Sequence, residues 1–303
     1  MMPRSTWDDL PAAVRAAIER ETGPVLGAEI PDAGRNSDFS ATLRLHDDVL
    51  FCKGIGNAEG KRGRMHRHER DVNPYLPSAV APRLRWSTEA AGWLLLGFDR
   101  VPGRHADLAP GSPDLPLVAD MLGTLARELA HCAANAPRLA EQWARLAAWC
   151  RLAHDIPADM DDLARGRLDV LQEWERRAIE LVEGDSLVHT DLHSLNIMIG
   201  HGRARVVDWA WSRLGEPAVD VAFLINRLIA AGHTPVAAER WAETVPVWCV
   251  TPENTRTALA VAILGIWEHV QRRNGLPHGS NLTAAARRWA QQRLDPPMSG
   301  YLA

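Results

Sequence analysis

The spacing of apolar residues changes character along this chain of 303 residues. Residues 11–21 have helical spacing, with Val14, Ala17 and Ile18 on one face, and a Gly-Pro pair follows as a stop signal. Short strand-like runs come next, joined by turn-rich pieces. These runs are VLGAEI (25–30), SATLRLH (40–46), DVLFCKGI (48–55), PRLRW (82–86) and GWLLLGF (92–98). Together they predict an antiparallel meander.

One helical segment interrupts these strands at residues 60–76, and it is charged nearly throughout. Its polarity indicates a helix that packs on one narrow face beside a sheet. After the Pro- and Gly-rich residues 100–116, helical patterns cover residues 117–134, 138–154, 166–183, 217–231, 236–246, 252–274 and 282–293. We therefore expect an α+β protein with a small N-terminal antiparallel β-sheet domain plus one main helix (residues 1–99) and a larger, mostly helical domain (residues 100–303).

Composition limits the class of protein and its partners. The chain is 46% apolar and 24% charged, which is typical of a soluble globular enzyme, and its net charge of -4 gives no bulk basic surface for nucleic acid. No apolar run approaches the ~18 residues of a membrane span, and the N-terminus has no apolar signal region. The four cysteines lack Cys-x-x-Cys spacing, so they indicate neither a disulfide framework nor a zinc knuckle. We expect a cytoplasmic protein that binds neither nucleic acid nor a membrane.

The densest group of polar residues stands in LVHTDLHSLNIMIGHGRARVVDWA, residues 187–210. This pattern of loop, short strand, Gly-rich turn and second strand predicts a β-hairpin among helices. Its polar residues include His189, Asp191, His193, Asn196 and Asp208. Three interpretations are open: a zinc site on HTDLH, a self-capping polar turn, and a site for proton transfer. Zinc is the weaker of these, because no further histidine or cysteine follows at a matching spacing.

Phosphoryl transfer is a reaction that this residue set would serve. It needs a carboxylate to orient the attacking hydroxyl, oxygen ligands for Mg²⁺, and a cation on the nucleotide phosphates. Asp191, Asn196 and Asp208 would meet the first two needs. Lys53, one of only two lysines among 34 basic residues, ends the third predicted strand and would supply the cation. Glu69 on the charged helix is the expected partner of Lys53, and a plain solvated position is its alternative.

Two further segments have weaker signals. The turn AGRNSDFS, residues 33–40, includes Ser37 and other small polar residues, and its backbone N–H groups would cover phosphates. It has only one glycine. Trp209 and Trp211 adjoin Asp208, where they either stack on a nucleotide base or simply belong to the core.

These motifs resemble one known family. The spacing of His189, Asp191 and Asn196, the hairpin to Asp208-Trp209, and the GEPAVDVAFLI that follows are similar to the aminoglycoside phosphotransferase and choline kinase family. That family is a branch of the protein-kinase-like fold, and the resemblance extends from the first strands to about residue 230. It implies a bilobal fold whose N-terminal lobe binds the nucleotide.

The resemblance also implies roles for individual residues. Asp191 would be the catalytic aspartate, while Asn196 and Asp208 would bind Mg²⁺. Lys53, paired with Glu69, would contact the α- and β-phosphates. His189 would brace the catalytic loop and Asp220 would anchor it from the next helix. A hinge at about 95–99, through Leu96, Gly97 and Phe98, would hold adenine by backbone hydrogen bonds. Two departures stand out: Thr190 replaces the glycine that the family more often has, and the nucleotide loop is poor in glycine.

Acidic residues give an indication of the charge of the acceptor. Between residues 151 and 191 there are eleven acids and five arginines, and such acids would attract a cationic substrate, although a solvated helix face is the simpler explanation. Asp155, Asp159 and Glu268 are the candidate substrate residues.

The predicted function is transfer of the γ-phosphoryl group of ATP or GTP, with Mg²⁺, to a hydroxyl of a small molecule. We expect an antibiotic of the aminoglycoside, cyclic-peptide, macrolide or nucleoside type, and thereby resistance. A metabolic kinase acting on a sugar, amino alcohol or nucleoside is the alternative, followed by a nucleotide-binding pseudokinase. The sequence does not fix the oligomeric state.

Overall fold

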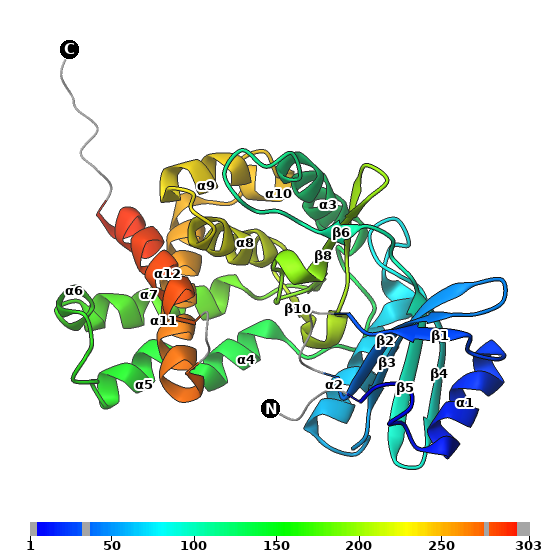
Figure 1. The fold of residues 1–303 in the computed structure, drawn as a ribbon. Coiled ribbons are helices and arrows are strands. Elements are labelled where there is room, and N and C mark those ends of the chain that lie inside the picture. The colour runs from blue at the N-terminus through cyan, green and yellow to red at the C-terminus, as the bar shows by residue number, and fades with distance from the viewer. Residues whose placement is uncertain (1–4, 32–36, 276–278, 296–303) are drawn as a thin grey trace. The chain divides into compact units, whose positions relative to one another are not determined.

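The computed structural model describes residues 5–31, 37–275 and 279–295, and Figure 1 shows their fold. The chain forms two compact units. Unit 1 comprises Met1–Ala106, Ala133–Ala136 and Ser194–Ser212, and unit 2 comprises Asp107–Cys132, Pro137–His193 and Arg213–Ala303. The predicted α+β class is confirmed, with an antiparallel sheet in the N-terminal part and mostly helices in the remainder. Among the described helices, none has the length and apolar character to cross a membrane.

Unit 1 is built on a five-stranded antiparallel sheet. Its strands are β1 (Gly27–Glu29), β2 (Phe39–Arg44), β3 (Val49–Ile55), β4 (Leu84–Ala90) and β5 (Trp93–Asp99). All five predicted strands are present, but the predicted meander is wrong, because the strand order is β1-β2-β3-β5-β4. The chain leaves the sheet after β3, forms a helix, and returns at the sheet edge as β4, so that β5 fills the place between them.

The two faces of this sheet have different neighbours. Side chains alternate across a strand. Leu50 and Cys52 of β3 therefore join the buried cluster that also contains Val14 and Ile18 of helix α1 (Ala12–Thr22). Fully burying such side chains stabilises a fold by about 1.5–3 kcal/mol each. The opposite face buries leucines of β5, and helix α2 (Lys61–Val72), with the short 3-10 helix η1 (Asn73–Tyr75), lies beside this sheet.

The hairpin predicted in the polar segment is present and belongs to unit 1. It consists of β8 (Ile197–Gly200) and β9 (Arg203–Val206), joined at its edge by β6 (Arg104–His105). The short 3-10 helices η2 (Ser194–Asn196) and η3 (Trp209–Trp211) flank it. Gly200 is required here, because a Cβ atom at this position would lie 2.2 Å from the backbone oxygen of Pro102.

Unit 2 is mostly helical. Its helices are α3 (Leu115–Glu128), α4 (Leu139–Leu146), α5 (Ala148–His154), α6 (Asp162–Arg165), α7 (Leu168–Leu181), α8 (Ala218–Ala230), α9 (Pro235–Ala242), α10 (Pro246–Cys249), α11 (Glu253–Asn274) and α12 (Gly279–Leu294). A small pair of strands, β7 (Ser186–Val188) and β10 (Arg213–Gly215), was not predicted. The predicted helix 138–154 is divided at Ala147, whose φ of 38° is left-handed. Glu175 of α7 then accepts the first free N–H groups of α5, from Trp149 and Cys150.

Candidate active site

Lys53 of β3 is held between two carboxylates of unit 1. Its Nζ donates to Glu69 Oε1 at 2.8 Å and Oε2 at 3.0 Å, and to Asp208 Oδ1 at 3.1 Å. The side chains of Lys53 and Glu69 are almost fully buried, whereas that of Asp208 is 26% exposed. The ion pair expected between Lys53 and Glu69 is therefore present, and Asp208 joins it.

The sheet explains how these groups meet. Lys53 lies opposite Leu96 in the β3–β5 ladder, so its side chain points to the face of the sheet on which α2 packs. Glu69 is on the buried face of α2, and Asp208 follows β9 in a left-handed conformation with φ of 66°. A strand, a helix and a hairpin thus supply one group each.

The electrostatics of this cluster are unbalanced, because one lysine faces two acids. Burial alone would lower the pKa of Lys53, but Asp208 and Glu69 outweigh it, so the pKa lies above its ordinary value. Burial raises the pKa of Glu69, and the charge of Lys53 offsets only part of this rise. The cluster carries an excess of negative charge that a bound cation would neutralise.

Helix α2 is tied to the residues after Asp208 by two further contacts. The backbone N–H of Trp209 donates to Glu69 Oε1 at 3.3 Å, and His68 Nε2 lies 2.9 Å from Ser212 Oγ. Trp209 is itself 1% exposed, so it belongs to the core, as the simpler interpretation had it. Glu69 is not a solvated helix residue, since it connects Lys53 to this segment.

Ser37 contacts a buried histidine. His66 Nδ1 donates to the backbone oxygen of Arg62 at 3.0 Å, and Nε2 therefore accepts from the Ser37 hydroxyl at 3.0 Å. Burial, followed by the charge of Lys53, lowers the pKa of His66 to about 4, so the ring is neutral at pH 7. The nucleotide role of Ser37 stays a prediction, and residues 33–36 of the same turn lie outside the described residues.

Asn196 and Asp208 stand at the same end of the hairpin. Ile197 pairs with Val206, and one step beyond this pair the N–H of Val207 donates to the backbone oxygen of Asn196 at 2.9 Å. An amide oxygen and a carboxylate are ligands that Mg²⁺ accepts beside phosphate oxygens. The donor types and the excess negative charge of the Lys53 cluster both fit a magnesium ion.

The residues of the expected hinge, Leu96, Gly97 and Phe98, lie inside β5. This strand pairs with β3 on one side and with β4 on the other, and the β4 ladder is irregular opposite Gly97 and Phe98. Their role in holding adenine stays a prediction. Gly97 has a structural reason of its own, because a Cβ atom there would lie 2.2 Å from the indole of Trp86 on β4.

The turn at residues 189–191 belongs to unit 2 and is held by Asp220 of α8. The carboxylate of Asp220 accepts the N–H groups of His189 and Thr190, each at 2.8 Å. The N–H of Asp191 donates in turn to His189 Nδ1 at 3.2 Å. The contacts expected of Asp220 as an anchor and of the fully buried His189 as a brace are thus present. Burial raises the pKa of Asp220 to about 6, against the effect of its two N–H donors.

This geometry argues against the zinc interpretation of HTDLH. His189 uses Nδ1 to accept the N–H of Asp191, which makes it part of the turn. His193 Nε2 lies 3.8 Å from Asp191 Oδ2, and the segment is a loop, so its side chains do not alternate as on a strand. Among the described residues, no group of three His, Cys, Asp or Glu side chains is arranged to hold a metal ion.

Thr190 adopts the backbone conformation that explains the family's preference for glycine. Its φ is 63°, in the left-handed region, where a β-branched side chain is strained. The grip of Asp220 on the N–H groups of residues 189 and 190 holds the turn in this form despite the strain.

Sequence reasoning missed Arg227. Its Nη2 lies 3.9 Å from Asp191 Oδ1, and its guanidinium lies over the ring of Trp267 at 5.1 Å from the ring centre. A signal was present, because Arg227 follows Asp220 by seven residues, which places both on the same face of a mostly apolar helix.

The three candidate substrate acids differ in their surroundings. Glu268 is buried and pairs with Arg287 at 2.6 Å and with Arg272 at 3.1 Å. Asp159 also pairs with Arg272. Asp155 is exposed and lines a cavity of about 640 Å³ that contains more arginine than acid. Two of the three acids are thus already neutralised by arginine.

The profile of the Phosphotransferase enzyme family matches residues 59–248. No curated protein matches the chain. Among solved structures, a thermostable mutant of aminoglycoside phosphotransferase APH(4)-Ia, in ternary complex with ADP and hygromycin B, is similar with 14% identity and a TM-score of 0.63, over 93% of this chain and 98% of that one.

Two other solved structures have the same fold. An aminoglycoside phosphotransferase from Alicyclobacillus acidocaldarius has 13% identity and a TM-score of 0.59, over 94% of each chain. Choline kinase LicA from Streptococcus pneumoniae has 13% identity and a TM-score of 0.59, over 92% of this chain and 98% of that one. At such identities the likeness concerns the fold, while the profile match, which covers more than half of the chain, concerns the family.

Proposed function

The chain belongs to the phosphotransferase enzyme family, and on that premise we propose that it transfers the γ-phosphoryl group of ATP or GTP to a hydroxyl of a small molecule. The observation that carries this proposal is the position of Lys53, between Glu69 and Asp208. A buried lysine that is shared by two acids is a point charge that would turn to phosphates when a metal ion takes over the charge of Asp208. Solved relatives with ADP or AMP-PNP support a nucleotide donor.

Each residue has a part in the proposed step. Asp191 would accept the proton of the acceptor hydroxyl and orient its oxygen. The bond between this oxygen and the γ-phosphorus would form while the bond to the β,γ-bridging oxygen breaks, and the nucleoside diphosphate would leave. Asn196 and Asp208 would hold Mg²⁺, which screens the charge of the phosphates when it is bound.

The acceptor is proposed by class. Solved relatives include a complex with hygromycin B and a choline kinase, which supports an antibiotic as the first class of acceptor and a metabolic alcohol as the second. An antibiotic acceptor would make the protein a resistance enzyme.

The test is to incubate the protein with Mg²⁺ and ATP or GTP, across a panel of antibiotics and hydroxyl metabolites, and to look for phosphate gain by mass. Asp191→Asn should still bind nucleotide but lose turnover by roughly 10³-fold or more, because the hydroxyl is no longer oriented or deprotonated. Near-normal turnover in this variant would remove Asp191 from the mechanism. Nucleotide binding without any transfer would instead indicate a pseudokinase.

A further inference from the structure

Arg227 is a charged side chain beside Asp191 that the proposed reaction does not use. Its Nη2 lies 3.9 Å from Asp191 Oδ1, which is longer than a hydrogen bond, and the Trp267 ring supports its guanidinium from one side. The side chain of Arg227 is 20% exposed. A partly buried cation is therefore fixed in place within reach of the group that would orient the acceptor.

The guanidinium of Arg227 has N–H donors that make no hydrogen bond to the described residues. Burial lowers the pKa of Arg227 and Asp191 offsets part of this, yet arginine remains a cation at any ordinary pH. Within the described chain its polar neighbour is Asp191, and that contact is too long for a hydrogen bond. Because unmet N–H donors of a desolvated guanidinium are costly, the position favours an oxyanion, which accepts two parallel N–H groups.

Helix α11 supplies the ring beside Arg227 and also carries two buried polar atoms one turn apart. Trp267 Nε1 and Gln271 Oε1 are buried, and neither has a hydrogen-bond partner among the described residues. Residues four apart face the same side of a helix, so these two groups accompany the ring that supports Arg227. Both atoms are closed off from solvent, as is Nε1 of Trp248, which likewise has no partner in the described part of the chain, so the contribution of α11 to Arg227 is the ring of Trp267.

The charges around the C-terminal half of α11 are balanced, so they do not favour the binding of a polycationic acceptor. The acids of this region are Asp155, Asp159, Asp161 and Glu268, and they are matched in number by Arg151, Arg272, Arg273 and Arg287. Glu268, the most buried of these acids, pairs with two of the arginines. An ammonium group would therefore have to displace an arginine to reach this carboxylate.

We infer that Arg227, supported by the ring of Trp267, recognises the acceptor, and that the acceptor carries an oxyanion, such as a carboxylate or a phosphate, close to the hydroxyl that it presents to Asp191. This inference rests on the proposed function, since it takes Asp191 as the group that orients the hydroxyl. According to this inference, polycationic aminoglycosides are not acceptors of this enzyme. The acceptor can be either an antibiotic or a metabolite, provided that it carries the oxyanion.

The experiment compares acceptors that differ in charge and share a scaffold. One set is glucosamine, glucose and glucuronate, and a second is choline, glycerol and glycerate. The full-length protein is given Mg²⁺ and ATP, and phosphate gain is followed by mass; binding to the protein with a non-hydrolysable ATP analogue is measured by calorimetry. The anionic member should exceed the other two of its set by roughly tenfold or more in kcat/KM or in affinity, as hydrogen bonds to charged groups do.

The variant Arg227→Gln should abolish this ranking, mainly by raising KM for the anionic member. Its matched control is Arg240→Gln, which removes one positive charge from an exposed position on α9 and should keep the ranking. A preference for the amine, or no ranking in either turnover or binding, would overturn the inference.

A second measurement tests whether Arg227 binds the oxyanion of the acceptor or the phosphoryl group that is transferred. If Arg227→Gln slows nucleotide hydrolysis without acceptor as strongly as it slows transfer, the guanidinium serves the nucleotide and the inference is wrong. Failure of the proposed function is a different result, since Asp191→Asn would then match the wild type in both hydrolysis and transfer.

Discussion

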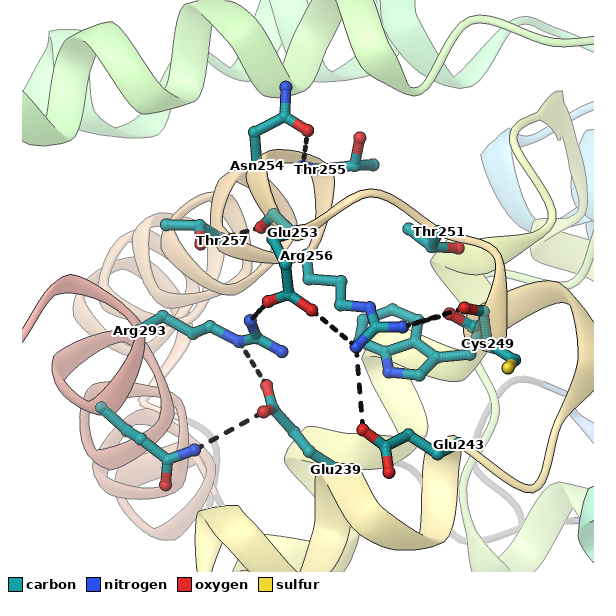
Figure 2. A network of polar contacts seen from close by, with 12 residues as sticks. Glu239, Glu243, Cys249, Thr251, Glu253, Asn254, Thr255, Arg256, Thr257 and Arg293 are labelled. Atoms are coloured by element: carbon teal, nitrogen blue, oxygen red, sulfur yellow. Dashed lines mark hydrogen bonds and ion pairs between the residues drawn. The ribbon is translucent and has the colours of Figure 1, made fainter. Parts of the chain in front are cut away.

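Two groups of charged side chains, one in each unit, have the same excess of one acid but use different cations. The Lys53 cluster consists of Lys53, Glu69 and Asp208 in unit 1. The Arg293 network of unit 2, shown in Figure 2, lies at the start of α11 and consists of Glu239, Glu243, Glu253, Arg256 and Arg293.

In the Arg293 network the excess negative charge is solvated. The side chains of Glu243 and Glu253 are 56% and 73% exposed, so the excess acid is hydrated. Arg256 also donates to the backbone oxygen of Trp248 at 2.8 Å, and its guanidinium lies over the ring of the same residue. The planar guanidinium groups have several fixed donors, which hold the helices together through lasting bonds to carboxylates.

The Lys53 cluster keeps its extra charge out of solvent. Glu69 has a side-chain exposure of only 3%, and Asp208 ends a hairpin beside Asn196. A lysine is a flexible point charge that can exchange one acid for a phosphate, whereas a network of arginines cannot do so without breaking. The contrast indicates that the first cluster serves a ligand and the second serves stability.

The largest expected effect is on turnover when Lys53 is removed. Lys53→Met should lower kcat roughly 10³-fold, because the phosphates lose their cation. The control is Lys61→Met, which changes the other lysine, exposed at the start of α2, and should leave kcat within about twofold of the wild type. Turnover of the acceptor found in the panel measures both. If Lys53→Met merely unfolds more easily and keeps its turnover, the cluster is as structural as the Arg293 network.

The Arg293 network should give the opposite result. Arg293→Met leaves Glu239, whose side chain is 13% exposed, without its cation, and should lower the free energy of unfolding by about 4 kcal/mol. Turnover per folded molecule should not change. Urea unfolding measures the loss, and adding Glu239→Gln should restore part of it, because the carboxylate that lost its partner is then neutral. A loss below about 1 kcal/mol would mean that solvent already screens this pair.

Asp220 extends the comparison to a buried acid that is held by backbone N–H groups. In the folded state the carboxyl of Asp220 keeps its proton up to about pH 6, whereas in the unfolded chain it releases the proton near pH 3.8. Protonation between these values favours the folded state, and this contribution is lost as the pH rises through about 6. Relative to Asp220→Asn, the wild type should therefore lose about 2 kcal/mol of unfolding free energy between pH 4 and pH 7. Urea midpoints at four pH values measure this, and parallel curves for the two proteins would contradict it.

The sequence predicted much of this site and missed what depends on three-dimensional packing. Periodicity located all five sheet strands and helix α2, and the acid on that charged helix was the expected partner of Lys53 in an ion pair. The sequence did not predict the strand order, because the pairing of β5 between β3 and β4 is decided by packing. Arg227 was missed because it is notable only for lying near Asp191, and Asp191 is 36 positions earlier in the chain.

The smallest expected effect concerns Thr190, whose residue type was noticed in the sequence but whose conformation was not. A left-handed φ costs a residue with a Cβ about 1–2 kcal/mol, and glycine escapes this cost while losing some entropy on folding. Thr190→Gly should therefore raise the free energy of unfolding by about 1 kcal/mol. Thr190→Ala is the matched control, since it removes the same hydroxyl but keeps the Cβ, and it should show no gain. Thermal melting of the three proteins measures the difference. Turnover of Thr190→Gly should stay close to the wild type, because Asp220 and His189 fix the turn through backbone N–H groups that the substitution retains.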